Sequence, residues 1–298
     1  MSISPSPQSQ QGLDLPRLPP ELERTIFEVA ALLRPKDIPA LLRVAWRVKH
    51  WIEPLLFRII FVSSSPVCET EGFLAVPLDI LLNKIPPESG SFFESSVHHI
   101  FVDLDQEQKI SILDTILAAS PRVTNLFILD DLTPQQLPSL GRLDGFLCFT
   151  IDLSPLFAPT AIDFGASLFR NLTHLELLDG SHDLPSDITV IPKLTHIAFN
   201  ISSGIASLHA RIQPNTQLRC IVFLQTTQPL AETSPVSDDV RFLCIRQTNF
   251  RVDWLRGATT GVDYWTLADA FIAAKQAGRV DRFQYCISDT DRDPSWWP

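Results

Sequence analysis

One apolar template occurs seven times in this chain, and this repeat limits the possible folds more than any other feature. In each copy, an apolar residue is followed by two variable residues, an apolar residue, one variable residue and a further apolar residue. The copies follow one another at intervals of roughly 22 to 26 residues and begin at Val97, Val123, Phe146, Leu172, Leu194, Leu218 and Val240. Intervals of this length indicate an array in which each copy is one supersecondary unit.

The template predicts one strand for each copy. Its last two apolar positions are two residues apart, so on a strand they share a face. One strand cannot bury such a face alone, but strands stacked in parallel form a continuous core. The sequence therefore predicts an α/β, leucine-rich-repeat-like solenoid with mostly parallel strands. The inward pairs are predicted to be Ile100 and Val102, Leu126 and Ile128, Phe149 and Ile151, Leu175 and Leu177, Ile197 and Phe199, Ile221 and Phe223, and Leu243 and Ile245.

The segments between the copies favour this fold over a doubly wound nucleotide-binding fold. Residues 106–120 have helical periodicity, but residues 181–193 and other connections are short and contain proline, which favours extended or single-turn structure. The phosphate-binding patterns GxGxxG and GxxxxGK[ST] do not occur. Neither does the nucleophile pattern GxSxG. We therefore expect a protein that is not an enzyme, with no catalytic residues and no cofactor.

Two histidines occupy the same template position in neighbouring copies. His174 and His196 are expected about one strand spacing apart, near 5 Å. The next copy has Cys220 at this position, and no third ligand type lines up with the two histidines. We therefore expect a structural or recognition role for the histidines and no metal site.

Charge and hydropathy narrow the remaining functions. The chain of 298 residues has a net charge of −10, so it repels phosphate backbones, and no nucleic-acid partner is expected. The first residues lack the pattern of a secretory signal. The apolar stretch 51–62 contains Glu53 and Arg58 and is too short to cross a bilayer. We expect a protein of the cytoplasm, the nucleus or both, without a membrane partner.

The segment 15–62 differs from the repeats and predicts a helical unit. Proline stands at the start of a first helix, which ends near residues 35–37. Residues 38–48 predict a second helix, and residues 51–61 form a third apolar segment broken near Pro54. A unit of this size has a small core, so it is expected to pack on the first repeat or to bind a partner.

This unit resembles an F-box. The resemblance rests on Leu18-Pro19, Glu21-Leu22, Ile26-Phe27, Asp37, Leu41-Leu42-Arg43-Val44 and Pro54-Leu55-Leu56-Phe57-Arg58. It implies the substrate-recognition subunit of a cullin-RING (Skp-cullin-F-box) ubiquitin ligase, whose residues 15–62 bind a Skp-type adaptor. The alternative is a stand-alone interaction scaffold in which the F-box-like helices only cap the solenoid. The residues implied to bind or support the adaptor are Leu18, Pro19, Leu22, Ile26, Leu41, Val44 and Trp51.

The layout of the whole chain is similar to a class of basidiomycete proteins that join an F-box-like unit to irregular leucine-rich repeats. This similarity implies four parts: a disordered tail (1–14), an F-box-like domain (15–62), a solenoid (63–252) and a C-terminal helical cap with a tail (253–298). In the cap, Trp265, Ala268, Phe271 and Ile272 share one helix face. The adjacent Trp296 and Trp297 either anchor a partner or fold back onto the cap.

The template also predicts a recognition surface on the outward positions of the strands. These positions include Phe101 and Phe127, which are costly to expose unless something covers them. One possibility is an unidentified protein target that contacts the repeats at Phe127, His174, Glu176 and His196. The other is that the tail, or the long loop 225–239, folds over this face.

Overall fold

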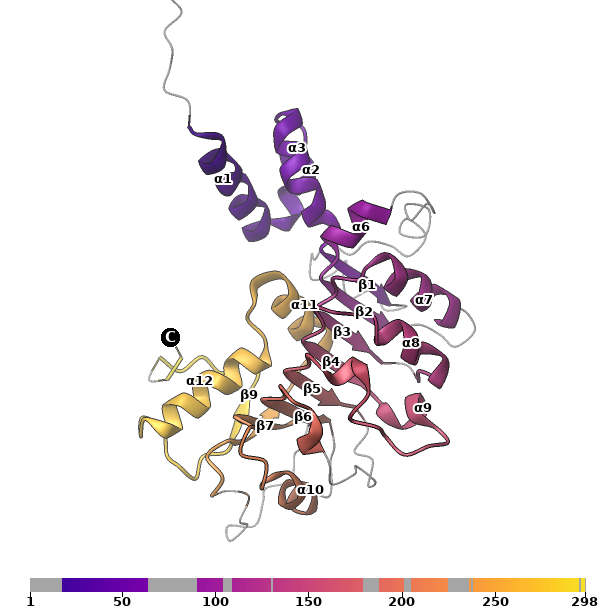
Figure 1. The fold of residues 1–298 in the computed structure, drawn as a ribbon. Helices are drawn as coiled ribbons and strands as arrows, with labels where there is room; N and C mark the ends of the chain where they lie inside the picture. The colour runs from indigo at the N-terminus through magenta and orange to yellow at the C-terminus, as the bar shows by residue number, and fades with distance from the viewer. Residues whose placement is uncertain are drawn as a thin grey trace, which may run out of the picture.

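The computed structural model describes residues 18–63, 90–103, 109–129, 131–178, 188–200, 205–224, 236, 238–294 and 296–297. The predicted tail 1–14 and most of the loop 225–239 lie outside these residues. The core of the fold is one nine-stranded sheet in which every neighbouring pair is parallel and the strands follow their order in the sequence (Figure 1). The strands are β1 Ile59–Ser63, β2 His99–Asp103, β3 Asn125–Ile128, β4 Cys148–Ile151, β5 His174–Leu177, β6 His196–Asn200, β7 Cys220–Leu224, β8 Phe242–Arg246 and β9 Cys286–Ser288.

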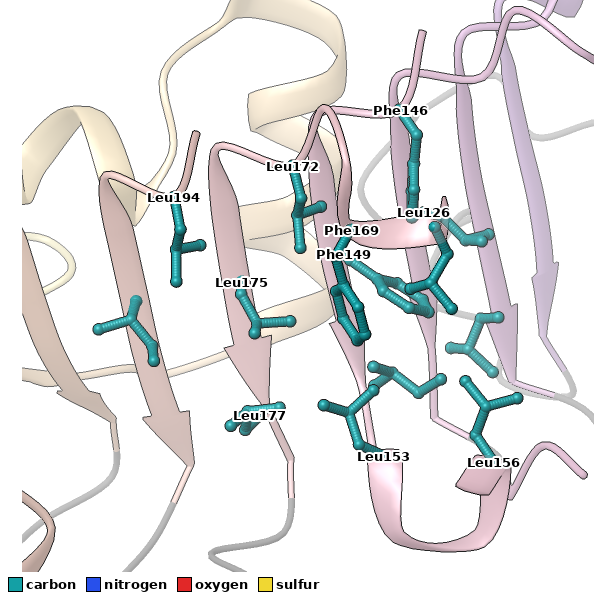
Figure 2. Packing of buried hydrophobic residues seen from close by; sticks show 14 of the residues in the cluster. Leu126, Phe146, Phe149, Leu153, Leu156, Phe169, Leu172, Leu175, Leu177 and Leu194 are labelled. Atoms are coloured by element: carbon teal, nitrogen blue, oxygen red, sulfur yellow. The ribbon is translucent and has the colours of Figure 1, made fainter. Parts of the chain in front are cut away.

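The register confirms the predicted α/β fold, which is consistent with a leucine-rich-repeat-like solenoid. Leu126 pairs with Phe149, and Leu175 pairs with Ile197, so equivalent template positions lie side by side. Figure 2 shows Leu126, Phe149 and Leu175 projecting from successive strands into one shared layer. The inward pairs of the first six copies are all buried in this main core.

The seventh pair was assigned to the wrong face. Phe242 pairs with Ile221 and lies with Cys244 in the main core, whereas Leu243 and Ile245 pack on the opposite side of the sheet. All four side chains are buried, so the pattern of apolar residues does not show whether Phe242 and Cys244 or Leu243 and Ile245 face the main core.

Helices on one side of the sheet complete the main core. Residues 106–120 do contain a helix, α7 (Lys109–Ala119), whose Leu113, Ile116 and Leu117 are buried. The helices in the other connections between the repeats are shorter, and several of them contain proline. They comprise α6 Gly90–Ser96, η4 Pro134–Gln136, α8 Leu137–Leu140, α9 Leu153–Phe157, η5 Ser167–Phe169, η6 Ile188–Val190 and α10 Ile205–Ile212.

The C-terminal helices α11 (Phe250–Thr260) and α12 (Tyr264–Gln276) lie on the opposite face of the sheet (Figure 1). They were expected to cap the last strand, but they cover the broad face, and β9 follows them. Asn249 and Asp263 cap their N-termini through side-chain oxygens. Gly261, with φ of 77°, ends α11 in the left-handed conformation that favours glycine.

Two aromatic clusters attach these helices to the sheet. Phe61, Phe101 and Phe127 of the first strands pack under Trp254 of α11. At the other end, Phe271 of α12 is buried over β7 and β8, and Trp296 folds back onto it with ring centroids 5.1 Å apart. The sheet is thus covered on both faces, as expected for parallel strands.

The N-terminal unit consists of α1 (Pro20–Leu33), η1 (Pro35–Asp37), α2 (Ile38–Leu41), α3 (Trp46–Ile52) and η2 (Glu53–Phe57). The continuous helix predicted for residues 38–48 is wrong, because extended Ala45 separates α2 from α3. Ile38 of α2 and Val48 of α3 are nevertheless both buried in one small core, so the two short helices bury apolar residues together without forming one continuous helix. The apolar segment predicted at 51–61 is also divided, and its end forms strand β1, which pairs with β2.

Candidate functional site

Exposed apolar side chains gather on the N-terminal helices. Leu22 and Ile26 are each 54% exposed, and Leu33 is 76% exposed. The spacing of residues 22, 26, 29 and 33 places them along one face of α1, and the exposed Leu18 lies just before this helix. Val44, in the turn before α3, and Trp46, the first residue of α3, are also exposed. We call this set the N-terminal apolar surface; it consists of Leu18, Leu22, Ile26, Val29, Leu33, Val44 and Trp46.

The surface is distinctive within the described part of the chain. Its members account for seven of the eleven large apolar side chains that are exposed there. Such a concentration is typical of interaction sites, because burying apolar side chains against a partner is favourable.

An ion pair holds the two helices of this surface together. Arg47 of α3 donates two hydrogen bonds to the Glu23 carboxylate of α1, at 3.0 Å from Nε and 2.6 Å from Nη2. Beneath it, Ala31, Ile38, Val48 and Ile52 form a closed core. The exposed side chains are therefore carried on a packed helical frame.

The predicted adaptor residues divide into two groups in this structure. Leu18, Pro19, Leu22, Ile26 and Val44 are exposed. Leu41 and Trp51 are only partly exposed, because they pack on the small core of the unit. Sequence reasoning missed Val29, Leu33 and Trp46, although the first two continue the spacing of Leu22 and Ile26 along α1.

A cleft of about 720 Å³ lies between this unit and the beginning of the sheet. Arg24 and Trp51 line it from the helices, and His98 and His99 line it from the sheet. Burial, together with the charge of Arg58, lowers the pKa of His99 to about 3, so this imidazole is neutral. The cleft shows that the helices do not close tightly over this part of the sheet.

The face predicted to bind a target is covered by the protein itself. Phe127 is 3% exposed, and its ring stacks on Phe101 and Phe250 with centroids 4.7 Å and 5.8 Å away. Glu176 and His196 are also buried, beneath α11 and α12. The expectation of an open face was therefore wrong. The alternative named the tail or the loop 225–239 as the cover, whereas the described residues that cover the face belong to α11 and α12.

A buried polar cluster occupies the centre of this covered face. Glu176 accepts hydrogen bonds from Thr150 Oγ1 at 3.0 Å and from Tyr264 Oη at 2.9 Å. Burial raises the pKa of Glu176 to about 7, against the opposing effect of these two donors. Burial and the nearby Asp263 also raise the pKa of Asp253 to about 6.

The space around this cluster is too small for a substrate. The cavity that Glu176 and Tyr264 line holds about 20 Å³, which is room for about one water molecule and far less than the roughly 300 Å³ or more of a ligand pocket. The raised pKa values therefore reflect the packing of α11 and α12 on the sheet. Tyr264 could not be identified from the sequence, because its contact with Glu176 joins residues far apart in the chain.

The predicted histidine pair is present beside this cluster. The rings of His174 and His196 stack with centroids 4.1 Å apart, and Trp265 meets both rings edge-on. Burial, with a contribution from His196, lowers the pKa of His174 to about 4. Asp269 of α12, which sequence reasoning missed, lies 2.9 Å from Nε2 of His196.

The fold defines an α/β protein built on a long, all-parallel, repeat-like sheet between N-terminal and C-terminal helices. Comparisons with protein-family models, curated proteins and solved structures find no match. Among the described residues, none of the helices combines the length and the apolar character needed to cross a membrane.

Proposed function

We propose that this protein is a non-catalytic interaction subunit whose N-terminal helices bind a Skp-type adaptor within a cullin-RING ubiquitin ligase. The observation that carries the proposal is the N-terminal apolar surface, since Leu18 before α1 and Leu22 and Ile26 on it are all more than half exposed. The F-box-like sequence of the same segment supports this choice of partner. Such a subunit acts by proximity, because it raises the local concentration of a target near the conjugating enzyme.

The second candidate is a stand-alone scaffold in which these helices only cap the array. One observation favours it. Ala31 and Ile38 of the N-terminal unit line a small apolar cavity together with Ala258 of α11. The unit therefore contacts the covered sheet on one side, while its apolar surface remains exposed on α1 and α3.

Binding of the purified chain to a purified Skp-type adaptor tests the proposal. The double variant Leu22→Ala, Ile26→Ala removes two exposed side chains of the surface. Truncating two interface anchors at about 1 to 2 kcal/mol each weakens binding by at least about tenfold. The double variant Leu18→Ala, Pro19→Ala is expected to act in the same direction.

The matched control is the double variant Val190→Ala, Phe283→Ala, whose side chains are 52% and 55% exposed but lie outside the N-terminal unit. It is expected to bind like the wild type. Because Leu22 and Ile26 are exposed, their truncation should leave the Tm almost unchanged. A wild-type chain that does not bind the adaptor, or a Leu22→Ala, Ile26→Ala variant that binds equally well, would refute adaptor docking.

A further inference from the structure

Three different metal-ligand groups converge where α12 crosses strands β6 and β7. His196 begins β6, Cys220 begins β7, and their Cα positions pair in the register of the sheet. Asp269 comes from α12. One ligand atom from each of these residues lies within 4.8 Å of the other two. No metal site was expected from the sequence, because no third ligand type lined up with His174 and His196. In the folded chain, Asp269 of α12 supplies such a ligand.

A chain of hydrogen bonds orients His196 for binding through Nε2. Oγ1 of Thr195 lies 3.3 Å from the carbonyl oxygen of Thr173 and 2.7 Å from Nδ1 of His196. A hydrogen-bond partner on one ring nitrogen is the usual arrangement behind a metal-binding histidine, and it leaves Nε2 facing Asp269.

Nε2 of His196 lies close to a carboxylate oxygen. It is 2.9 Å from Oδ1 of Asp269, a distance at which one proton joins the two atoms in a hydrogen bond. A zinc ion can replace that proton, because two ligands about 2.0 to 2.2 Å from a tetrahedral zinc lie about 3.4 Å apart, and the exposed Asp269 side chain can move by the difference.

We propose that His196, Cys220 and Asp269 bind a zinc ion that joins α12 to strands β6 and β7. An imidazole and a thiolate favour zinc over magnesium or calcium, which prefer oxygen ligands. Three protein ligands leave a fourth tetrahedral position for water. The proposal is independent of adaptor docking, because this site lies under the C-terminal helices.

Binding must release the thiol proton of Cys220 to the solvent, because the thiolate is the metal ligand. Nε2 of His196 must also be free of a proton to bind the metal. Burial raises the pKa of Cys220 well above its ordinary value, so the metal has to compete with the thiol proton. Asp269 provides the route of entry, because its side chain is 57% exposed while Cys220 is fully buried.

Titration of the reduced full-length chain with Zn²⁺ and Co²⁺ tests the site. We expect binding of one Zn²⁺ for each chain at this site, a higher Tm with Zn²⁺ than with Mg²⁺, and a thiolate-to-cobalt charge-transfer absorption with Co²⁺. Cys220→Ser should abolish that absorption. Asp269→Asn changes an exposed side chain, so it should keep the fold and weaken Zn²⁺ binding at least about tenfold.

Cys286→Ser and His174→Gln are the matched controls. Cys286 is an exposed cysteine of β9, and His174 stacks on His196 without belonging to the ligand set. Both variants should keep the cobalt absorption and the Zn²⁺-dependent rise in Tm. Absence of Zn²⁺ binding in the wild type overturns the proposal. Equal binding by folded Asp269→Asn, or a cobalt absorption that survives Cys220→Ser, also overturns it.

Discussion

Replacing Glu176 by glutamine should remove a pH dependence from the stability of this protein. The side chain is 3% exposed, and Thr150 and Tyr264 both donate to it. Asp253 and Asp263 add negative charge nearby. Glutamine keeps an oxygen that accepts the two hydrogen bonds, but it cannot ionise. It therefore mimics the protonated glutamic acid that this buried environment favours.

The expected size follows from the two pKa values of Glu176. In the folded protein the carboxyl keeps its proton up to about pH 7, whereas its ordinary pKa is 4.5. Its stabilising contribution is thus fully present below pH 4.5 and is lost as the pH rises through 7. At 1.36 kcal/mol for each pKa unit, the free energy of unfolding of the wild type should fall by about 2 to 3 kcal/mol, relative to Glu176→Gln, between pH 5 and pH 8.

Urea denaturation of both proteins across this pH range measures the difference. Asp253 titrates in both proteins, so subtracting the two curves removes most of its contribution. The control is Glu94→Gln, which changes an exposed carboxylate of α6 and should give a curve parallel to the wild type. If the curves for Glu176→Gln and the wild type are also parallel, Glu176 does not hold its proton in the folded state and the argument from burial is wrong.

Two further substitutions test the packing and the ion pairs. Phe149→Ala, at a side chain 1% exposed in the main core, should lower the free energy of unfolding by about 3 to 5 kcal/mol in urea denaturation, whereas Phe283→Ala on the surface should change it by less than about 0.5 kcal/mol. Burial alone raises the pKa of Asp239, but hydrogen bonds from His209 and Arg241 lower it overall, so the wild type should lose stability as the pH falls below 3.8. Asp239→Asn should have a lower Tm at pH 6 and a weaker acid dependence, and a Tm equal to that of the wild type at pH 6 would contradict this.

The strands could be predicted because their signal is local. Pairs such as Leu126 and Ile128 repeat at a fixed spacing, and only parallel stacking buries all of them. The register of β8 could not be predicted, because Phe242, Leu243, Cys244 and Ile245 are all apolar and both faces of the sheet are buried. Strand β9 also escaped prediction, since it has only three residues and returns to the sheet after two helices.

The covered face could be anticipated only in part. Phe101 and Phe127 at outward positions indicated that something must lie over the sheet, but their spacing does not say what. The answer is set by contacts between residues far apart in the sequence, such as the 2.7 Å ion pair between Arg251 and Asp103. For the N-terminal unit, the F-box-like pattern named several exposed residues without showing that α1 presents them on one continuous face.

The cover that α11 and α12 form has a consequence for the order of events during synthesis. Strands that pair only with their neighbours can form one after another as the chain leaves the ribosome. The aromatic face of β1 to β3 nevertheless stays uncovered until Trp254, Leu255 and Ala258 emerge. At about 5 to 20 residues per second, the interval between Phe127 and Ala258 lasts on the order of ten seconds. During that time the nascent chain presents stacked phenylalanines to the solvent, so we expect chaperones to bind this half of the sheet before the C-terminus is complete.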